Sequence, residues 1–196
     1  DGAKSLTFNS DKKLGGEFTG GAALTKKGTG NLTLNAANPE WTGSIYLQAG
    51  TLTASGNTSF GMGDIYASGG TINLASKAID NDIYVTDKGV VSIIGGKKYT
   101  GNIDVDGSLA TKTSICLAEG SSLTLRSGKH SATVSGKGTL RVQDGNVTLQ
   151  TGKYTMSELE IDSKLIVQTI PPALPKSDSH IRINEGGSLT SAGKIR

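Results

Sequence analysis

Short alternations of apolar and polar residues recur along the whole chain, separated by turns that contain glycine. The string "SIYLQAGTL" at 44–52 is repeated closely as "DIYASGGTI" at 64–72 and loosely at 82–91. Within each string the apolar residues have a period of two, which places alternate side chains on opposite sides of a strand. Sustained helical spacing is missing, and Gly, Thr, Asn and Ser occur in every segment. The pattern therefore predicts β-strands throughout the chain.

The glycine before each apolar run indicates the length of the repeat. Gly30, Gly50, Gly70, Gly89 and Gly107 follow one another at intervals of 20, 20, 19 and 18 residues, after which the interval becomes irregular. One such unit cannot bury its apolar row alone, whereas stacked units can. We therefore expect an all-β fold, a right-handed parallel β-helix (solenoid) of about ten coils, with about 20 residues per coil.

Isoleucines form a second row in parallel with the glycines. Similar short strings contain Ile45, Ile65, Ile83, Ile103 and Ile115. Because apolar side chains are buried where a strand packs on a core, we expect Ile45, Ile65, Ile83 and Ile103 to point inward as one stacked row, and Ile115 continues the register of this row in the sequence.

Three tyrosines each follow one of these isoleucines. Tyr46, Tyr66 and Tyr84 fall at equivalent places in consecutive coils, so we expect them to stack on the outside as an aromatic ladder. Such a ladder can stabilise the pairing of coils. It can also offer a surface for a ligand such as a glycan ring. The sequence leaves both roles open.

One stretch carries a recognisable repeat. Residues 14–55, "LGGEFTGGAALTKKGTGNLTLNAANPEWTGSIYLQAGTLTAS", resemble the passenger-associated transport repeat, also called the autotransporter-associated β-strand repeat, of Gram-negative surface proteins. Weaker copies follow at 98–109, 136–142 and 153–161. The positions of this sequence that match the family pattern are Leu24, Lys26, Gly28, Gly30, Leu32, Leu34, Trp41, Thr42, Gly43, Ile45, Leu47, Gly50 and Leu52.

The resemblance implies a passenger segment that is secreted or displayed on the cell surface of a Gram-negative bacterium. Such a segment is exported through an outer-membrane translocator, supports translocation and folding, and acts as a stalk without enzymatic activity. Host or cell-surface glycans or proteins are the partners it implies. An alternative is a carbohydrate-binding or adhesive β-helix module, and a third is a polysaccharide lyase.

Composition and charge exclude several classes of protein. The net charge is +3, and the lysine pairs at 12–13, 26–27 and 97–98 are expected to be solvated at turns, so no nucleic-acid partner is expected. No apolar run reaches the length of a membrane span. The single cysteine, Cys116, excludes an internal disulfide and is expected to be a shielded thiol. We expect no cofactor.

Few residues suggest catalysis or metal binding. Asp80 with Asp82, and Asp104 with Asp106, place carboxylates two residues apart, as lyase and calcium sites do, but we expect them to be solvated turn carboxylates. The two histidines, at 130 and 180, belong to no hydrolase or metal motif and are expected at the surface. No catalytic or metal-binding residue is therefore assigned.

The domain organisation follows from the repeat. We expect residues 1–196 to form a single β-helix domain, a fragment of a longer surface protein. Residues 168–180 hold three of the four prolines and cannot continue a central strand, so they are expected to form a Pro-rich loop before one last coil.

Overall fold

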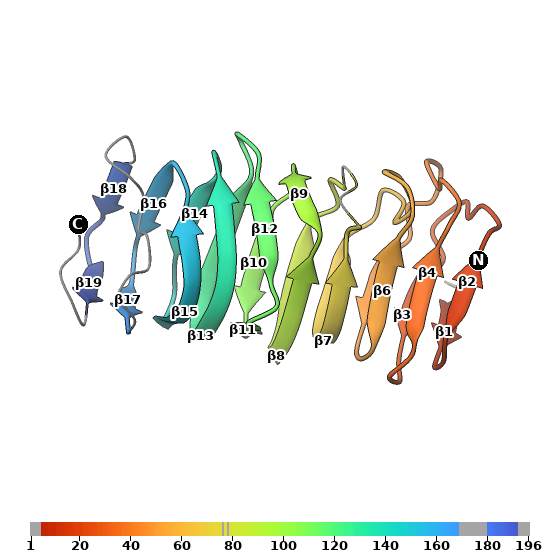
Figure 1. The fold of residues 1–196 in the computed structure, drawn as a ribbon, viewed down its shortest axis with the longest axis horizontal. Helices are drawn as coiled ribbons and strands as arrows, with labels where there is room; N and C mark the ends of the chain where they lie inside the picture. Colours follow the sequence, from red (N-terminus) through yellow and green to blue (C-terminus); the bar gives the residue numbers. More distant parts are fainter. Residues whose placement is uncertain (1–4, 76, 78, 169–179, 192–196) are drawn as a thin grey trace.

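The chain winds into a parallel β-solenoid (Figure 1). The structure is a computed structural model that describes residues 5–75, 77, 79–168 and 180–191. These residues form 19 strands and no helix. They make about nine turns of roughly 20 residues each, one turn fewer than expected. The predicted fold class is confirmed, because every pairing between the described strands is parallel.

A first stack of paired strands runs the length of the rod. Each strand is followed by its equivalent in the next coil, with Ile83, for example, between Ile65 and Ile103. In chain order the stack contains β1 (Ser5–Phe8), β3 (Ala23–Lys26), β5 (Ile45–Leu47), β7 (Ile65–Asn73), β8 (Ile83–Ile94), β10 (Ile103–Asp106), β13 (Ser122–Gly136), β14 (Thr139–Val142), β16 (Glu158–Ile161) and β18 (His180–Ile183).

A second stack follows it within each coil. The long strands β7, β8 and β13 cross from the first stack into the second, so one strand serves both. The other members are β2 (Lys12–Leu14), β4 (Asn31–Leu34), β6 (Thr51–Ala54), β11 (Ser108–Leu109), β15 (Asn146–Thr155), β17 (Lys164–Val167) and β19 (Ser188–Ser191).

A third stack is present in the middle coils. It consists of β9 (Gly96–Tyr99), β12 (Ser114–Leu117) and the ends of β13 and β15. The pairs Ile115 with Val134 and Val134 with Tyr154 define its register.

Apolar side chains of the strands fill the interior. Ile45, Ile65, Ile83 and Ile103 pair in register, and each is fully buried, as predicted. The prediction that Ile115 continues this row was wrong. Leu123 follows Ile103, whereas Ile115 belongs to the third stack.

The glycine repeat is more regular than the sequence indicated. A Cβ atom on Gly128 would overlap the backbone oxygen of Gly107, so these two glycines stack in consecutive coils at an interval of 21 residues. Gly120, the next glycine before an apolar run in the sequence, is therefore not the equivalent of Gly107, since open space surrounds a Cβ at that position.

The C-terminal coil forms as predicted, because β18 pairs with β16 and β19 pairs with β17. Of the Pro-rich segment 168–180, residues 169–179 lie outside the described residues.

Candidate functional site: the repeat motif and the tyrosine ladder

The apolar residues of the repeat motif line the core. Leu24 pairs with Ile45 in the first stack, and Leu32 pairs with Leu52 in the second. All of the following have an exposed fraction of 1% or less: Leu24, Leu32, Leu34, Trp41, Ile45, Leu47 and Leu52. The motif therefore supplies core residues, because each of these side chains packs between neighbouring coils.

Trp41 joins two coils through its ring nitrogen. The indole Nε1 donates a hydrogen bond to the backbone oxygen of Ala22 at 2.7 Å, and the Phe18 ring lies 5.1 Å from the indole. Gly43 packs against the same backbone oxygen of Ala22, which an added Cβ at position 43 would overlap. Thr42, between these two motif residues, is exposed. A buried tryptophan needs a partner for its N–H, and the preceding coil supplies it.

Two tyrosines repeat this arrangement further along the rod. The Tyr99 hydroxyl contacts the backbone oxygen of Asn81, and the Tyr154 hydroxyl accepts from the backbone N–H of Ala132 at 3.2 Å. Both rings are 1% exposed, and burial raises the pKa of both hydroxyls. The three aromatics of the strong and weak repeat copies thus each bond to the backbone of the coil before.

Lys26 lies inside the rod, contrary to the expectation of a solvated turn lysine. Its ammonium donates to the backbone oxygens of Lys27 and of Gly28, the latter at 2.8 Å. The residue is 0% exposed, and desolvation lowers the pKa of its ammonium group against the opposing effect of Asp11. A buried cation is tolerated because carbonyl oxygens at the coil corner solvate it. We call Lys26, Gly28, Gly30 and Gly50 the lysine corner.

Gly50 completes the lysine corner from the next coil. Its backbone has a positive φ of 76°, a conformation that favours glycine. An added Cβ would lie 2.7 Å from Lys26 Nζ and would overlap the backbone oxygens of Gly28 and Gly30. The four motif positions therefore form one packed unit.

The other two lysine pairs are solvated, as predicted, but they lie in strands and not at turns. Lys12 and Lys13 belong to β2 and are exposed, and Lys97 and Lys98 belong to β9 and are also exposed. Strand positions hold these lysines in a fixed register, which the turn assignment had missed.

The tyrosine ladder forms on the outside of the first stack. The ring centroids of Tyr46 and Tyr66 are 5.4 Å apart, and those of Tyr66 and Tyr84 are 5.1 Å apart, with nearly parallel planes. Burial, and then the Asp64 carboxylate, raises the pKa of Tyr66 and of Tyr84. Because the rings cover each other's faces, the ladder offers mainly ring edges and hydroxyls to a ligand.

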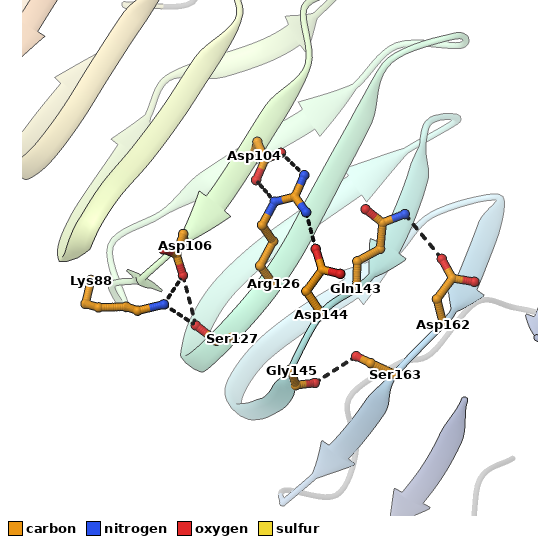
Figure 2. A network of polar contacts seen from close by, with 10 residues as sticks. All are labelled: Lys88, Asp104, Asp106, Arg126, Ser127, Gln143, Asp144, Gly145, Asp162 and Ser163. Carbon is orange, nitrogen blue, oxygen red and sulfur yellow. Dashed lines mark hydrogen bonds and ion pairs between the residues drawn. The ribbon is translucent and has the colours of Figure 1, made fainter. Parts of the chain in front are cut away.

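Beyond the ladder, the outer surface carries paired charges (Figure 2). The Arg126 guanidinium donates to both carboxylate oxygens of Asp104, at 2.8 and 2.7 Å, and also contacts Asp144. Lys88 contacts Asp106, and this hydrogen bond lowers the pKa of that carboxyl group. The expectation of solvated turn carboxylates was wrong for these two aspartates, which lie in β10.

The same surface continues toward the C-terminus with polar pairs between coils. Glu160 accepts from Arg141 at 2.8 Å and from Arg182 at 3.1 Å. Gln143 donates to Asp162 at 3.3 Å, as Figure 2 shows. Each of these contacts links residues 19 to 22 positions apart, so the pairs fasten coil to coil.

Other candidate residues are separate from one another. Asp80 and His180 are exposed, as expected, and Asp82 accepts from the backbone N–H of Asn102 at 2.7 Å. Cys116 is half-buried in β12, in line with a shielded thiol. In the part of the chain that the structure describes, no group of three or more His, Cys, Asp or Glu side chains could hold a metal ion.

His130 is in the core, so the prediction of a surface histidine was wrong. The ring is 0% exposed, its Nδ1 accepts from the Leu109 N–H at 3.3 Å, and its Nε2 lies 2.8 Å from the Ser127 oxygen. These partners fit a neutral ring that donates from Nε2. Burial lowers the pKa of His130 to about 4.

Stability is therefore expected to depend on His130 in mildly acidic solution. His130 binds a proton below about pH 6.5 in the unfolded chain but only below about pH 4 in the folded protein. Lowering the pH from 6.5 to 4 therefore favours the unfolded state, and the free energy of unfolding falls by about 3 kcal/mol. Urea unfolding at several pH values measures this loss. His130→Gln keeps an acceptor and a donor but does not titrate, and it should flatten the profile. Equal pH profiles for both proteins would contradict the assignment.

Among the described residues, no helix has the length and apolar character needed to cross a bilayer.

Part of the sequence is similar to a known adhesin. Over 114 residues, 58% of this chain, the sequence is 35% identical to the Adhesin BmaC autotransporter of Brucella suis biovar 1 (strain 1330). The aligned part covers 3% of that protein, so this chain corresponds to a small portion of it. No family model matches the chain, and no solved structure matches it. The chain is thus similar in sequence to part of an autotransporter adhesin and folds as a parallel β-solenoid.

Proposed function

We propose that this chain is a structural, non-enzymatic segment of an autotransporter-like protein that is secreted or displayed on a Gram-negative cell surface. The continuous parallel register of the first stack, from β1 to β18, carries the proposal. A rod of this kind can act as a stalk that holds the parts of the protein at its two ends apart. The similarity to an autotransporter adhesin supports a place at the cell surface.

A role in export follows from how a solenoid folds. Each coil is stabilised mainly by its neighbours, so folding starts at one well-formed coil and spreads. Residues 24–55 contain the lysine corner and the Trp41 bond to the preceding coil. We propose that this segment, which resembles the passenger-associated transport repeat, folds first as the chain leaves an outer-membrane translocator.

Surface display of the parent protein tests the proposal. Scrambling residues 24–55 should lower the displayed amount several-fold, because the starting coil is lost. Deleting residues 65–82 is the matched control, since Ile65 and Ile83 are equivalent and the deletion removes one coil in register. Protease accessibility on intact cells, normalised to total protein, measures display.

Ligand binding per displayed molecule decides between this function and a direct adhesive role. The second candidate is favoured by Tyr46, whose ring is 41% exposed at the end of the tyrosine ladder. A transport scaffold predicts unchanged binding by the displayed molecules. Normal display with lost binding would refute it and would favour a carbohydrate-binding module.

A further inference from the structure

The third stack presents a face with cations and no carboxylates. Its strand segments, 96–99, 114–117, 132–136 and 151–155, contain no aspartate or glutamate. Lys97, Lys98 and Lys153 are exposed on these strands, and Lys112 is exposed in the turn before β12. We call this surface the lysine face.

The lysines of this face have no ion-pair partner among the residues that the structure describes. On the first stack the arginines contact carboxylates, as Arg126 does with Asp104 and Arg182 does with Glu160. Within the described residues, by contrast, no ion pair involves Lys97, Lys98 or Lys153. Carboxylates lie at the rim of the face: Glu119 follows β12 and lies 3.8 Å from Lys137, and Glu158 lines the same hollow. The described part of the first stack thus carries arginines paired with carboxylates, whereas the described lysines of the third stack have no ion pair.

A shallow groove crosses the lysine face. The residues that line it are Gly95, Gly96, Lys97, Ser114, Ile115, Cys116 and Ser135. Gly96 packs tightly on the core beneath the groove, since an added Cβ would point inward and lie 3.1 Å from the buried Leu74 side chain. The groove therefore combines one cation with hydroxyl groups.

We infer that the lysine face binds a linear anionic polysaccharide that lies along the rod. Neighbouring strands are about 4.8 Å apart, so three steps, about 14 Å along the rod, separate Lys97 on β9 from Lys153 on β15. The two lysines are also offset along the strand direction, because Lys153 is in register with Ser114 whereas Lys97 follows the partner of Ile115. An extended chain with regularly spaced sulfate or carboxylate groups reaches both lysines, and serine hydroxyls bond its sugar hydroxyls. The inference rests on the proposed function, because a surface stalk meets such polymers.

A nucleic acid fits this face less well. Single strands are held by bases that stack on exposed aromatic rings. The aromatic residues of the third stack, Tyr99 and Tyr154, are 1% exposed and face the core. The tyrosine ladder lies on the first stack, so it does not supply such a platform here.

Binding of a fluorescein-labelled heparin oligosaccharide to the purified chain tests the inference. The triple variant Lys97→Gln/Lys98→Gln/Lys153→Gln should raise the apparent Kd about tenfold, and the effect should shrink at high salt. Lys12→Gln/Lys13→Gln/Lys27→Gln is the matched control, because it removes the same charge from exposed positions in the first coils. The control should change Kd less than about twofold. Circular dichroism verifies that both variants fold.

Several results would overturn the inference. One is an equal loss of heparin affinity in the two triple variants. The others are no heparin binding by the unmodified chain, and tighter binding of duplex DNA than of heparin. Neutral dextran should not bind. Display of the parent protein is expected to be normal in the lysine-face variant, so a failed heparin result leaves the stalk function standing. Lost display on scrambling 24–55 is likewise measured independently of heparin.

Discussion

Replacing Ile83 by aspartate should destabilise the solenoid by about 4 kcal/mol or more, enough to unfold its central coils. Ile83 is 0% exposed and lies between Ile65 and Ile103 in the first stack. A carboxylate there has apolar neighbours on both sides and no cation within the row, so its desolvation is uncompensated. Urea unfolding followed by circular dichroism gives the free energy of unfolding.

The neighbouring position supplies the control. Tyr84 points outward, so Tyr84→Thr should lose only the stacking on Tyr66 and cost about 1 kcal/mol. Threonine is preferred to aspartate here because Asp104 lies directly opposite in the next coil. Equal losses in Ile83→Asp and Tyr84→Thr, or a reversed order, would show that the strand register is wrong by one residue.

Gly50→Ala is expected to have the second large effect, about 3 kcal/mol. The substitution forces an alanine into a positive φ and presses its Cβ against Lys26 Nζ and two backbone oxygens. Two of the three atoms that the Cβ would meet belong to the backbone, which moves little. The overlap is therefore relieved only if the residues of the lysine corner move apart. The midpoint of urea unfolding measures the loss.

Gly16→Ala is the matched control for Gly50→Ala. Nothing lies within 4 Å of a Cβ at Gly16, and the residue is exposed. Its stability should change by less than about 0.5 kcal/mol. A similar small change for Gly50→Ala would mean that the lysine corner is not packed as described.

The period of two predicted the strands and the inward row from Ile45 to Ile103, because every side chain in a regular strand follows the alternation, and the repeat of about 20 residues predicted the coils. Ile115 was wrongly assigned to this row because its string, "SICL", resembles the strings that contain the other isoleucines. Its interval from Ile103 is 12 residues, whereas Leu123 lies a full coil of 20 residues further on. Coil length, and not the local string, was the reliable signal.

Buried polar residues escaped prediction for a different reason. Lysine and histidine are usually exposed, and a sequence does not show which carbonyl oxygens surround them. Lys26 is buried because the corner that follows it turns two backbone oxygens toward its ammonium. His130 is buried because Ser127 and Leu109 satisfy both ring nitrogens.

Charge distribution was visible only in three dimensions. Arg126 and Asp104 are 22 residues apart, yet consecutive coils place them in contact. Lys97 and Lys153 are far apart in the sequence, and the third stack brings them to one face. The scattered lysines of the sequence are therefore a surface feature of the fold.

Surface display of the parent protein carrying Gly50→Ala, compared with Gly16→Ala, tests most directly the central claim that coil stacking is what this segment contributes. Protease accessibility on intact cells and ligand binding per displayed molecule are measured together. The account predicts that Gly50→Ala lowers the displayed amount and leaves binding per displayed molecule unchanged, while Gly16→Ala changes neither. Full display of Gly50→Ala with reduced binding would contradict it.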